Sequence, residues 1–145
     1  MVFKFEIGDP KSGKTFHLEA EAESLIGKVI GEKISGEEIA KELTGVELEI
    51  TGISDKAGFP GFKKIEGTGL KRVLLTKGFG LKKIHKKKKT SKGALKKGLR
   101  LRRTLRGNTI TEDIVQINLK VTKQGEKSIA ELLGKESSQK SEITT

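Results

Sequence analysis

Apolar and polar residues alternate with a period of two at the start of the chain, and this pattern predicts short β-strands. Phe3, Phe5 and Ile7 share one face of the first run, while charged residues occupy the other face. Residues 15–21 alternate in the same way, and the intervening residues 8–14 contain the Asp-Pro pair and glycines typical of a turn. Two alternating runs joined by a turn predict a β-hairpin.

Similar runs later in the chain predict further strands and one or two short helices. Strands are expected at 46–50, 70–76 and 108–121, with a short strand or bend within 25–34. Ser35 is placed to cap a short helix over 37–43, and a last helix is expected over 128–133.

Short strands separated by glycine turns predict the fold class. We expect an all-β chain: a small β-barrel-like domain of short antiparallel strands, with one or two short helices and a basic, partly extended insertion. At 145 residues the chain suits one domain. We assign this domain to residues 1–133 and expect residues 134–145 to form a flexible polar tail.

The charge is concentrated in the middle of the chain. Residues 1–50 carry six bases and eleven acids (net −5), residues 51–106 carry nineteen and two (net +17), and residues 107–145 carry five and six (net −1). Residues 81–106 alone hold thirteen Lys or Arg and no acid. Like charges repel within a Debye length of about 8 Å at physiological salt, so a polyanion is the expected partner, and nucleic acid is the commonest one.

A disordered, solubilising run is the plainer interpretation of such a basic segment. Its position argues against that interpretation, because the run lies between two predicted strands. It also contains spaced apolar residues, among them Leu95, Leu99 and Leu101.

Composition removes several classes of function. The chain has no cysteine, so neither a disulfide nor thiol chemistry is available. We expect no signal peptide and no membrane segment, because no long apolar run is present. His17 and His85 lie far apart and lack ligand-like spacing, so neither a metal nor a cofactor is expected. We find no nucleophile–base pair and expect no enzyme activity.

The aromatic residues limit how a nucleic acid would be read. The chain has six Phe and neither Trp nor Tyr. Proteins that read single-stranded bases usually stack them on aromatic side chains. We therefore expect this chain to contact phosphates and RNA shape rather than bases.

Residues 8–15, GDPKSGKT, match the phosphate-loop pattern G-x-x-x-x-G-K-[ST]. That loop requires a following helix whose N-terminus faces the phosphates. Here the following residues alternate with period two, so a hairpin turn is expected instead. A nucleotide hydrolase using Lys14 remains an unfavoured alternative, which Lys14→Ala would inactivate while leaving an RNA-binding protein nearly unchanged.

Four segments carry a resemblance to a known family. Residues 52–60 (GISDKAGFP) resemble its S-D-K-x-G-F-P loop, residues 72–78 (RVLLTKG) its R-x-L-L-S-x-G strand and turn, and residues 98–108 (GLRLRRTLRGN) its G-x-R-x-R-K-x-V-R-G-N segment; residues 117–127 add a fourth similarity. The family is small-subunit ribosomal protein six of the archaeal and eukaryotic type, the eS6 family. The resemblance runs from Val2 to about Leu133.

The chain also departs from the family pattern. Gly61 stands where the family commonly has Met, and the lysine run 86–89 with the segment after it is longer than the usual bridge. The length, without a long basic C-terminal helix, is that of archaeal members.

The resemblance implies a β-barrel-type domain that binds ribosomal RNA as part of the small subunit of the cytoplasmic ribosome. Neighbouring ribosomal proteins would be its other partners, with no membrane and no small-molecule substrate. Family basic residues carry over onto Lys56, Arg72, Lys77, Arg100, Arg102, Arg103 and Arg106. A free, non-ribosomal RNA-binding module is the alternative.

The predicted RNA-binding site combines these positions with the other bases of the same region. In β-strand alternation, Leu99 and Leu101 would face the barrel while Arg100 and Arg102 face RNA. The full predicted set is Lys56, Lys63, Lys64, Lys71, Arg72, Lys77, Lys82, Lys83, His85, Lys86, Lys87, Lys88, Lys89, Lys92, Lys96, Lys97, Arg100, Arg102, Arg103 and Arg106.

Overall fold

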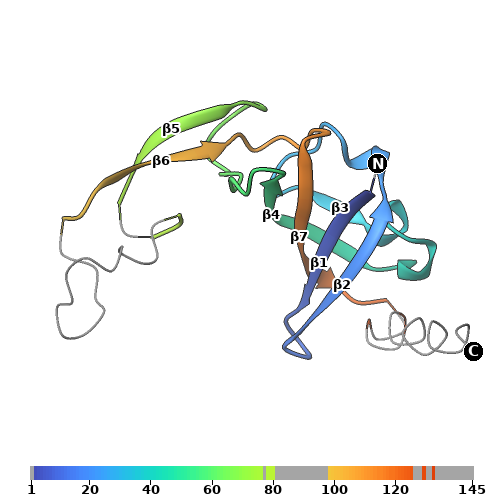
Figure 1. The fold of residues 1–145 in the computed structure, drawn as a ribbon. Helices are drawn as coiled ribbons and strands as arrows, with labels where there is room; N and C mark the ends of the chain where they lie inside the picture. Colours follow the sequence, from blue (N-terminus) through green and yellow to red (C-terminus); the bar gives the residue numbers. More distant parts are fainter. Residues whose placement is uncertain (1, 77, 81–97, 126–128, 130–131, 133–145) are drawn as a thin grey trace, which may run out of the picture.

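The computed structural model describes residues 2–76, 78–80, 98–125, 129 and 132 (Figure 1). These residues form strands and short 3-10 helices. In chain order the elements are β1 (Val2–Asp9), β2 (Lys14–Glu21), η1 (Glu23–Leu25), β3 (Lys33–Ser35), η2 (Gly36–Glu38), η3 (Lys41–Leu43), β4 (Glu47–Asp55), β5 (Leu70–Leu75), β6 (Leu101–Arg106) and β7 (Ile114–Lys123).

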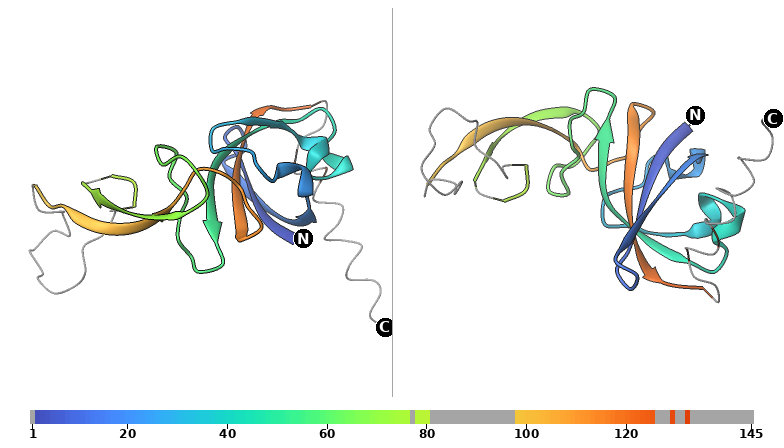
Figure 2. Two further views of the ribbon diagram at one scale, coloured as in Figure 1. Left: turned by 90° about the horizontal axis from the view of Figure 1, so that it is seen from above. Right: turned by 60° about the horizontal axis from the view of Figure 1, so that its bottom comes forward.

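The strands form two separate sheets. One sheet has five strands in the order β2-β1-β7-β4-β3, and the other is the two-stranded pair β5-β6. We call the five-stranded sheet with its 3-10 helices the sheet body, and we call β5, β6 and the loop 56–69 the arm. The arm projects away from the sheet body in all three views (Figures 1 and 2).

The period-two pattern of the sequence places the core of the sheet body as expected. Phe3, Phe5 and Ile7 of β1 are at most 1% exposed, and β1 pairs with β2 in the predicted hairpin. In β7 the pattern shifts by one residue, because the pairing with β4 is irregular between Ser54 and Asp55. Ile114 is therefore buried and Val115 only half-buried.

The prediction of a barrel-like domain built from antiparallel strands was wrong in two respects. β1 and β7 pair in parallel, so the sheet is mixed. Its edge strands β2 and β3 are not paired with each other within the described residues, so the sheet stays open. β3 has only three residues before η2 begins, which leaves too short an edge for closure.

The predicted helix over 37–43 forms as two 3-10 turns, η2 and η3. Ala40 between them has an extended backbone, with φ −152° and ψ 140°. Ser35 does lie at the start, where its backbone N–H donates to Glu38 Oε1 over 3.3 Å. A segment this short gains few helical hydrogen bonds after nucleation, so tertiary packing decides its form.

The structure describes only two residues of the helix predicted near the C-terminus. Ile129 and Leu132 are helical, and Ile129 is fully buried in the core. The other residues of the helix predicted over 128–133, the tail 134–145 and most of the basic insertion, residues 81–97, lie outside the described residues. The boundary of the 1–133 domain stays a prediction.

The arm has a small core of its own. Ile65, Leu75 and Leu105 are buried together, with Phe62, Val73, Leu99 and Leu101 packed around them. A two-stranded hairpin with so little apolar burial is marginal by itself. The arm therefore depends on its attachment to the sheet body.

Candidate nucleic-acid interface

The predicted RNA-binding residues that the structure describes lie on the arm. Lys56 follows β4, Lys63 and Lys64 lie in the loop before β5, and the rest belong to β5 or to β6 and the residues just before it. Those whose side chains are exposed are Lys56, Lys63, Lys64, Lys71, Arg72, Arg100 and Arg102, while Arg103 is half-buried. Predicted residues outside the described part are Lys77, Lys82, Lys83, His85, Lys86, Lys87, Lys88, Lys89, Lys92, Lys96 and Lys97.

The alternation predicted for residues 99–102 is present. Arg100 and Arg102 are exposed, while Leu99 and Leu101 are half-buried. The two leucines pack on the core of the arm, not on the sheet body as predicted. Packing within the arm therefore fixes the strand segment that carries Arg100 and Arg102.

The exposed cations of the arm have no counter-ions among the described residues. None of its described Lys or Arg residues except Arg106 forms an ion pair with a described carboxylate. Glu66 is the only acid between residues 56 and 105, and Lys71 Nζ reaches its backbone oxygen, at 3.4 Å, rather than its carboxylate. This concentration of unneutralised charge suits a polyanion with closely spaced phosphates.

Three lysines of the sheet body, by contrast, form ion pairs with carboxylates. Lys4 Nζ lies 3.4 Å from Glu19 Oε1, and Lys123 Nζ lies 2.7 Å from Glu47 Oε1. Lys28 Nζ donates to Glu38 Oε2, and this hydrogen bond lowers the pKa of the Glu38 carboxyl. Acids also outnumber bases in residues 1–50, by eleven to six, so the net positive charge of the described residues is concentrated on the arm.

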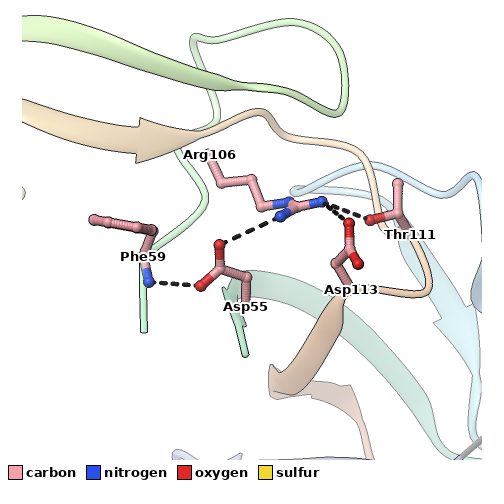
Figure 3. Close-up of polar contacts among 5 residues, drawn as sticks. All are labelled: Asp55, Phe59, Arg106, Thr111 and Asp113. Atoms are coloured by element: carbon pink, nitrogen blue, oxygen red, sulfur yellow. Dashed lines mark hydrogen bonds and ion pairs between the residues drawn. The ribbon is translucent and has the colours of Figure 1, made fainter. Parts of the chain in front are cut away.

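Arg106 is the exception on the arm, and the structure removes it from the RNA-facing set. Its side chain is only 10% exposed. One terminal nitrogen lies 3.3 Å from Asp55 Oδ2, and the other donates to Asp113 Oδ2 at 2.8 Å and to Thr111 Oγ1 at 3.1 Å (Figure 3). At the end of β6 the strand reaches the sheet body, so this side chain meets carboxylates instead of solvent.

Arg106 joins the arm to the sheet body at the end of β4 and the start of β7. We call Asp55, Arg106, Thr111 and Asp113 the arm joint. Asp55 also accepts the Phe59 backbone N–H through Oδ1 at 2.8 Å (Figure 3). The carboxylate therefore fixes both the guanidinium and the loop that leads into the arm.

Backbone contacts reinforce the same joint. Arg106 N–H donates to Pro60 O, and Phe62 N–H donates to Arg106 O, both at 3.0 Å. A Cβ at Gly107 would lie 1.7 Å from Gly67 O, so the chain leaving β6 passes directly against the loop. Gly61 is equally confined, since a Cβ there would lie 2.3 Å from Ile53 Cγ1. This loop position leaves no room for a side chain such as Met without rearrangement.

The phosphate-loop pattern at residues 8–15 forms a hairpin turn, as predicted. The turn joins β1 to β2, and β2 begins at Lys14 where a nucleotide site would need a helix. Asp9 organises the turn by accepting the backbone N–H groups of Lys11 at 2.9 Å and Ser12 at 3.3 Å. Gln124 also donates to Asp9, through Nε2 at 3.0 Å.

These contacts predict acid sensitivity at Asp9. A hydrogen bond from the Ser12 side chain, with those from the turn backbone and Gln124, outweighs burial and lowers the pKa of Asp9 below its ordinary 3.8. A lowered pKa in the folded state stabilises the fold above the ordinary value, and this stabilisation is lost as the pH falls through the folded-state pKa. Asp9→Asn should therefore melt at a lower temperature than the wild type at pH 7, and the difference should shrink below pH 4.

Thermal melts followed by circular dichroism between about pH 7 and pH 2 test this prediction. Glu37→Gln is the matched control, because Glu37 is exposed and no hydrogen bond ties it to a turn. A constant difference between Asp9→Asn and the wild type across the whole range would contradict the assignment.

The described residues contain neither a membrane-spanning helix nor a metal-binding group of side chains. No helix there is long and apolar enough to cross a membrane. No group of three or more acidic or histidine side chains there is arranged to hold a metal ion.

Comparisons with known proteins agree along nearly the whole chain. The family model for ribosomal protein S6e matches residues 3–134. The small ribosomal subunit protein eS6 of Methanocaldococcus jannaschii is 45% identical over 139 residues, covering 96% of each chain. That of Methanothermobacter thermautotrophicus is 41% identical over 135 residues, 92% of this chain and 97% of the relative. That of Methanoculleus marisnigri is 36% identical over 132 residues, 89% and 90% of the two chains.

Proposed function

The chain belongs to the ribosomal protein S6e family, and from this premise we propose that it is held in the small ribosomal subunit by ribosomal RNA bound along its arm. The family is not enzymatic, which agrees with the hairpin turn found at residues 8–15. The proposed place of action is the cytoplasmic ribosome.

One observation carries the proposal: residues 56–105 hold a single acid, and the described cations there form no ion pair with a described carboxylate, whereas acids outnumber bases in residues 1–50. Each phosphate neutralised by Lys or Arg releases condensed counterions, which favours binding. Arg100 and Arg102 can each bind a phosphate through two parallel N–H groups, whereas Lys acts as a point charge. The lysine-rich residues 82–97 extend the same set by sequence.

In this arrangement the arm makes most of the RNA contacts and the sheet body faces away from them. Residues 1–50, which supply β1 to β3 and all three of the described 3-10 helices, carry a net charge of −5. An acidic surface is repelled by phosphates, so basic neighbouring ribosomal proteins suit it better as partners.

Sedimentation of a native lysate on a sucrose gradient tests the proposed function. We expect the protein to sediment with the small subunit at low salt and to be released by washing at high salt, because its contacts are electrostatic. Detection of the protein only at the top of the low-salt gradient would favour a free RNA-binding module.

A further inference from the structure

A cavity lies beside the arm joint, between the loop and β6. Its volume is about 420 Å³, and it is lined by residues 58–60, residues 102–105 and Gly80. Ligand-binding cavities in proteins typically measure about 300–1,000 Å³, so this one can hold a small organic group.

The lining combines positive charge with apolar surface. Arg102 and Arg103 are among the lining residues, and neither forms an ion pair with a described carboxylate. As successive residues of β6 they direct their side chains to opposite faces, with Arg103 on the same face as Leu105. Phe59 and Pro60 face them from the loop and are both half-buried. Figure 3 shows the Phe59 ring directed away from the arm joint, so the ring is not used by the Asp55–Arg106 contacts.

The strand edge beside the cavity offers hydrogen-bonding groups. β6 pairs with β5 along one edge, and the only described partner along its other edge is the loop at Arg106. Arg106 directs both its N–H and its C=O to that loop. Because backbone groups of a strand repeat their direction every second residue, those of Thr104 and Arg102 point to the same edge, toward the cavity.

We propose that this cavity takes a single unpaired nucleotide of ribosomal RNA, extruded from its stack. The nucleotide's phosphate binds Arg103, its base packs against Phe59 and Pro60, and the edge of the base hydrogen-bonds to the backbone of β6. Bases splayed from single-stranded RNA are recognised by this combination of stacking and edge contacts. The inference rests on the proposed function and adds a base-contacting site to a surface otherwise suited to phosphates.

A peptide strand added to the open edge of β6 is the competing occupant. The basic lining disfavours it, because an added strand uses backbone hydrogen bonds and does not need a cation beside them. The cavity also contains no carboxylate among its lining residues, and it is continuous with the other unneutralised cations of the arm. Charge complementarity therefore selects the nucleotide.

Titration of the ¹⁵N-labelled full chain, followed by amide chemical shifts, tests the site. The probes are AMP, GMP, CMP and UMP, with inorganic phosphate, the corresponding nucleosides and an acidic hexapeptide as separate titrations. We expect at least one nucleotide to shift the amides of Phe59, Arg102 and Thr104 in a saturable way, about fivefold more tightly than phosphate.

Variants separate the base contact from the phosphate contact. Phe59→Leu keeps an apolar side chain but removes the aromatic face, so it should weaken nucleotide binding about fivefold or more and leave phosphate binding unchanged. Arg103→Gln should weaken both. Lys33→Gln on β3 makes the same change of charge on the sheet body and should alter neither.

Three outcomes would overturn the inference. Equal binding of phosphate and nucleotides would show that the cavity is only an anion site. Chemical-shift changes spread over all exposed cations would show that the cavity is not a specific site. A response to the hexapeptide alone would identify the edge of β6 as a peptide-binding edge. These failures are distinguishable from failure of the proposed function. In each of them the wild type would still bind deproteinised small-subunit RNA through the arm.

Discussion

Replacing Arg106 by alanine is expected to lower the free energy of unfolding by about 3–5 kcal/mol, the usual result of removing one partner from a buried ion pair. Asp55, whose side chain is 4% exposed, would be left without its buried guanidinium partner. The arm has a small core, so loss of the joint should also loosen the arm from the sheet body. Urea unfolding of the wild type and the variant measures the difference.

The two carboxylates of the arm joint provide the controls. Asp113 is 64% exposed, so Asp113→Asn should cost about 1 kcal/mol or less. Asp55→Asn should cost clearly more, because it leaves the guanidinium buried with one exposed counter-ion. The double variant Asp55→Ala with Arg106→Ala should lose less stability than the sum of the two single variants. Additive losses, or a loss below about 1 kcal/mol for Arg106→Ala, would show that the joint is not a coupled unit.

Reversing the charge of Arg100 and Arg102 together is the second large expected effect. Both side chains are exposed, so Arg100→Glu with Arg102→Glu should change the free energy of unfolding by less than about 1 kcal/mol. Affinity for small-subunit RNA should fall at least about tenfold, because two phosphate contacts become repulsions. Equilibrium binding to deproteinised RNA at a fixed salt concentration measures this loss.

The matched control tests whether position or total charge matters. Lys11→Glu with Lys14→Glu makes the same change of net charge at two exposed positions, one in the turn after β1 and one at the first residue of β2. We expect this variant to bind RNA nearly as well as the wild type. A loss equal to that of the Arg100 and Arg102 variant would mean that only net charge, and not the arm, determines binding.

The sequence was sufficient to predict the parts of the fold that follow from local periodicity. The alternation of Phe3, Phe5 and Ile7 identified the inner face of β1. The period-two alternation of residues 15–21 predicted a strand instead of a helix after the phosphate-loop pattern, and hence a hairpin. Alternation also placed Arg100 and Arg102 on an exposed face. In each case the neighbours of a residue in sequence determine its environment.

The errors arose where distant segments meet. The parallel pairing of β1 with β7 joins the first and last strands of the sheet, and no local pattern encodes such a pairing. The family resemblance placed Arg106 among the RNA-binding residues, but β6 reaches the sheet body at that residue, where the side chain pairs with carboxylates. Two acids in the sequence could have indicated the ion pairs of Arg106. Asp55 ends β4 and Asp113 lies seven residues after Arg106, and both are its partners in the structure.

The cavity could not have been predicted from sequence for a related reason. Residues 58–60 and 102–105 are far apart along the chain and approach each other only because Arg106 pairs with the loop. The scarcity of aromatic residues predicted contacts to phosphates and RNA shape rather than to bases. The proposed nucleotide site would add one base contact, at Phe59, to that expectation.

The salt dependence of RNA affinity tests most directly whether unneutralised charge on the arm holds the protein to RNA. Contacts to about seven phosphates predict a slope of roughly −5 to −6 in a plot of the logarithm of affinity against the logarithm of salt concentration. We expect this steep, linear decrease for the purified wild type binding deproteinised small-subunit RNA between about 50 mM and 500 mM KCl. Equal affinity at the two ends of that range would contradict the account.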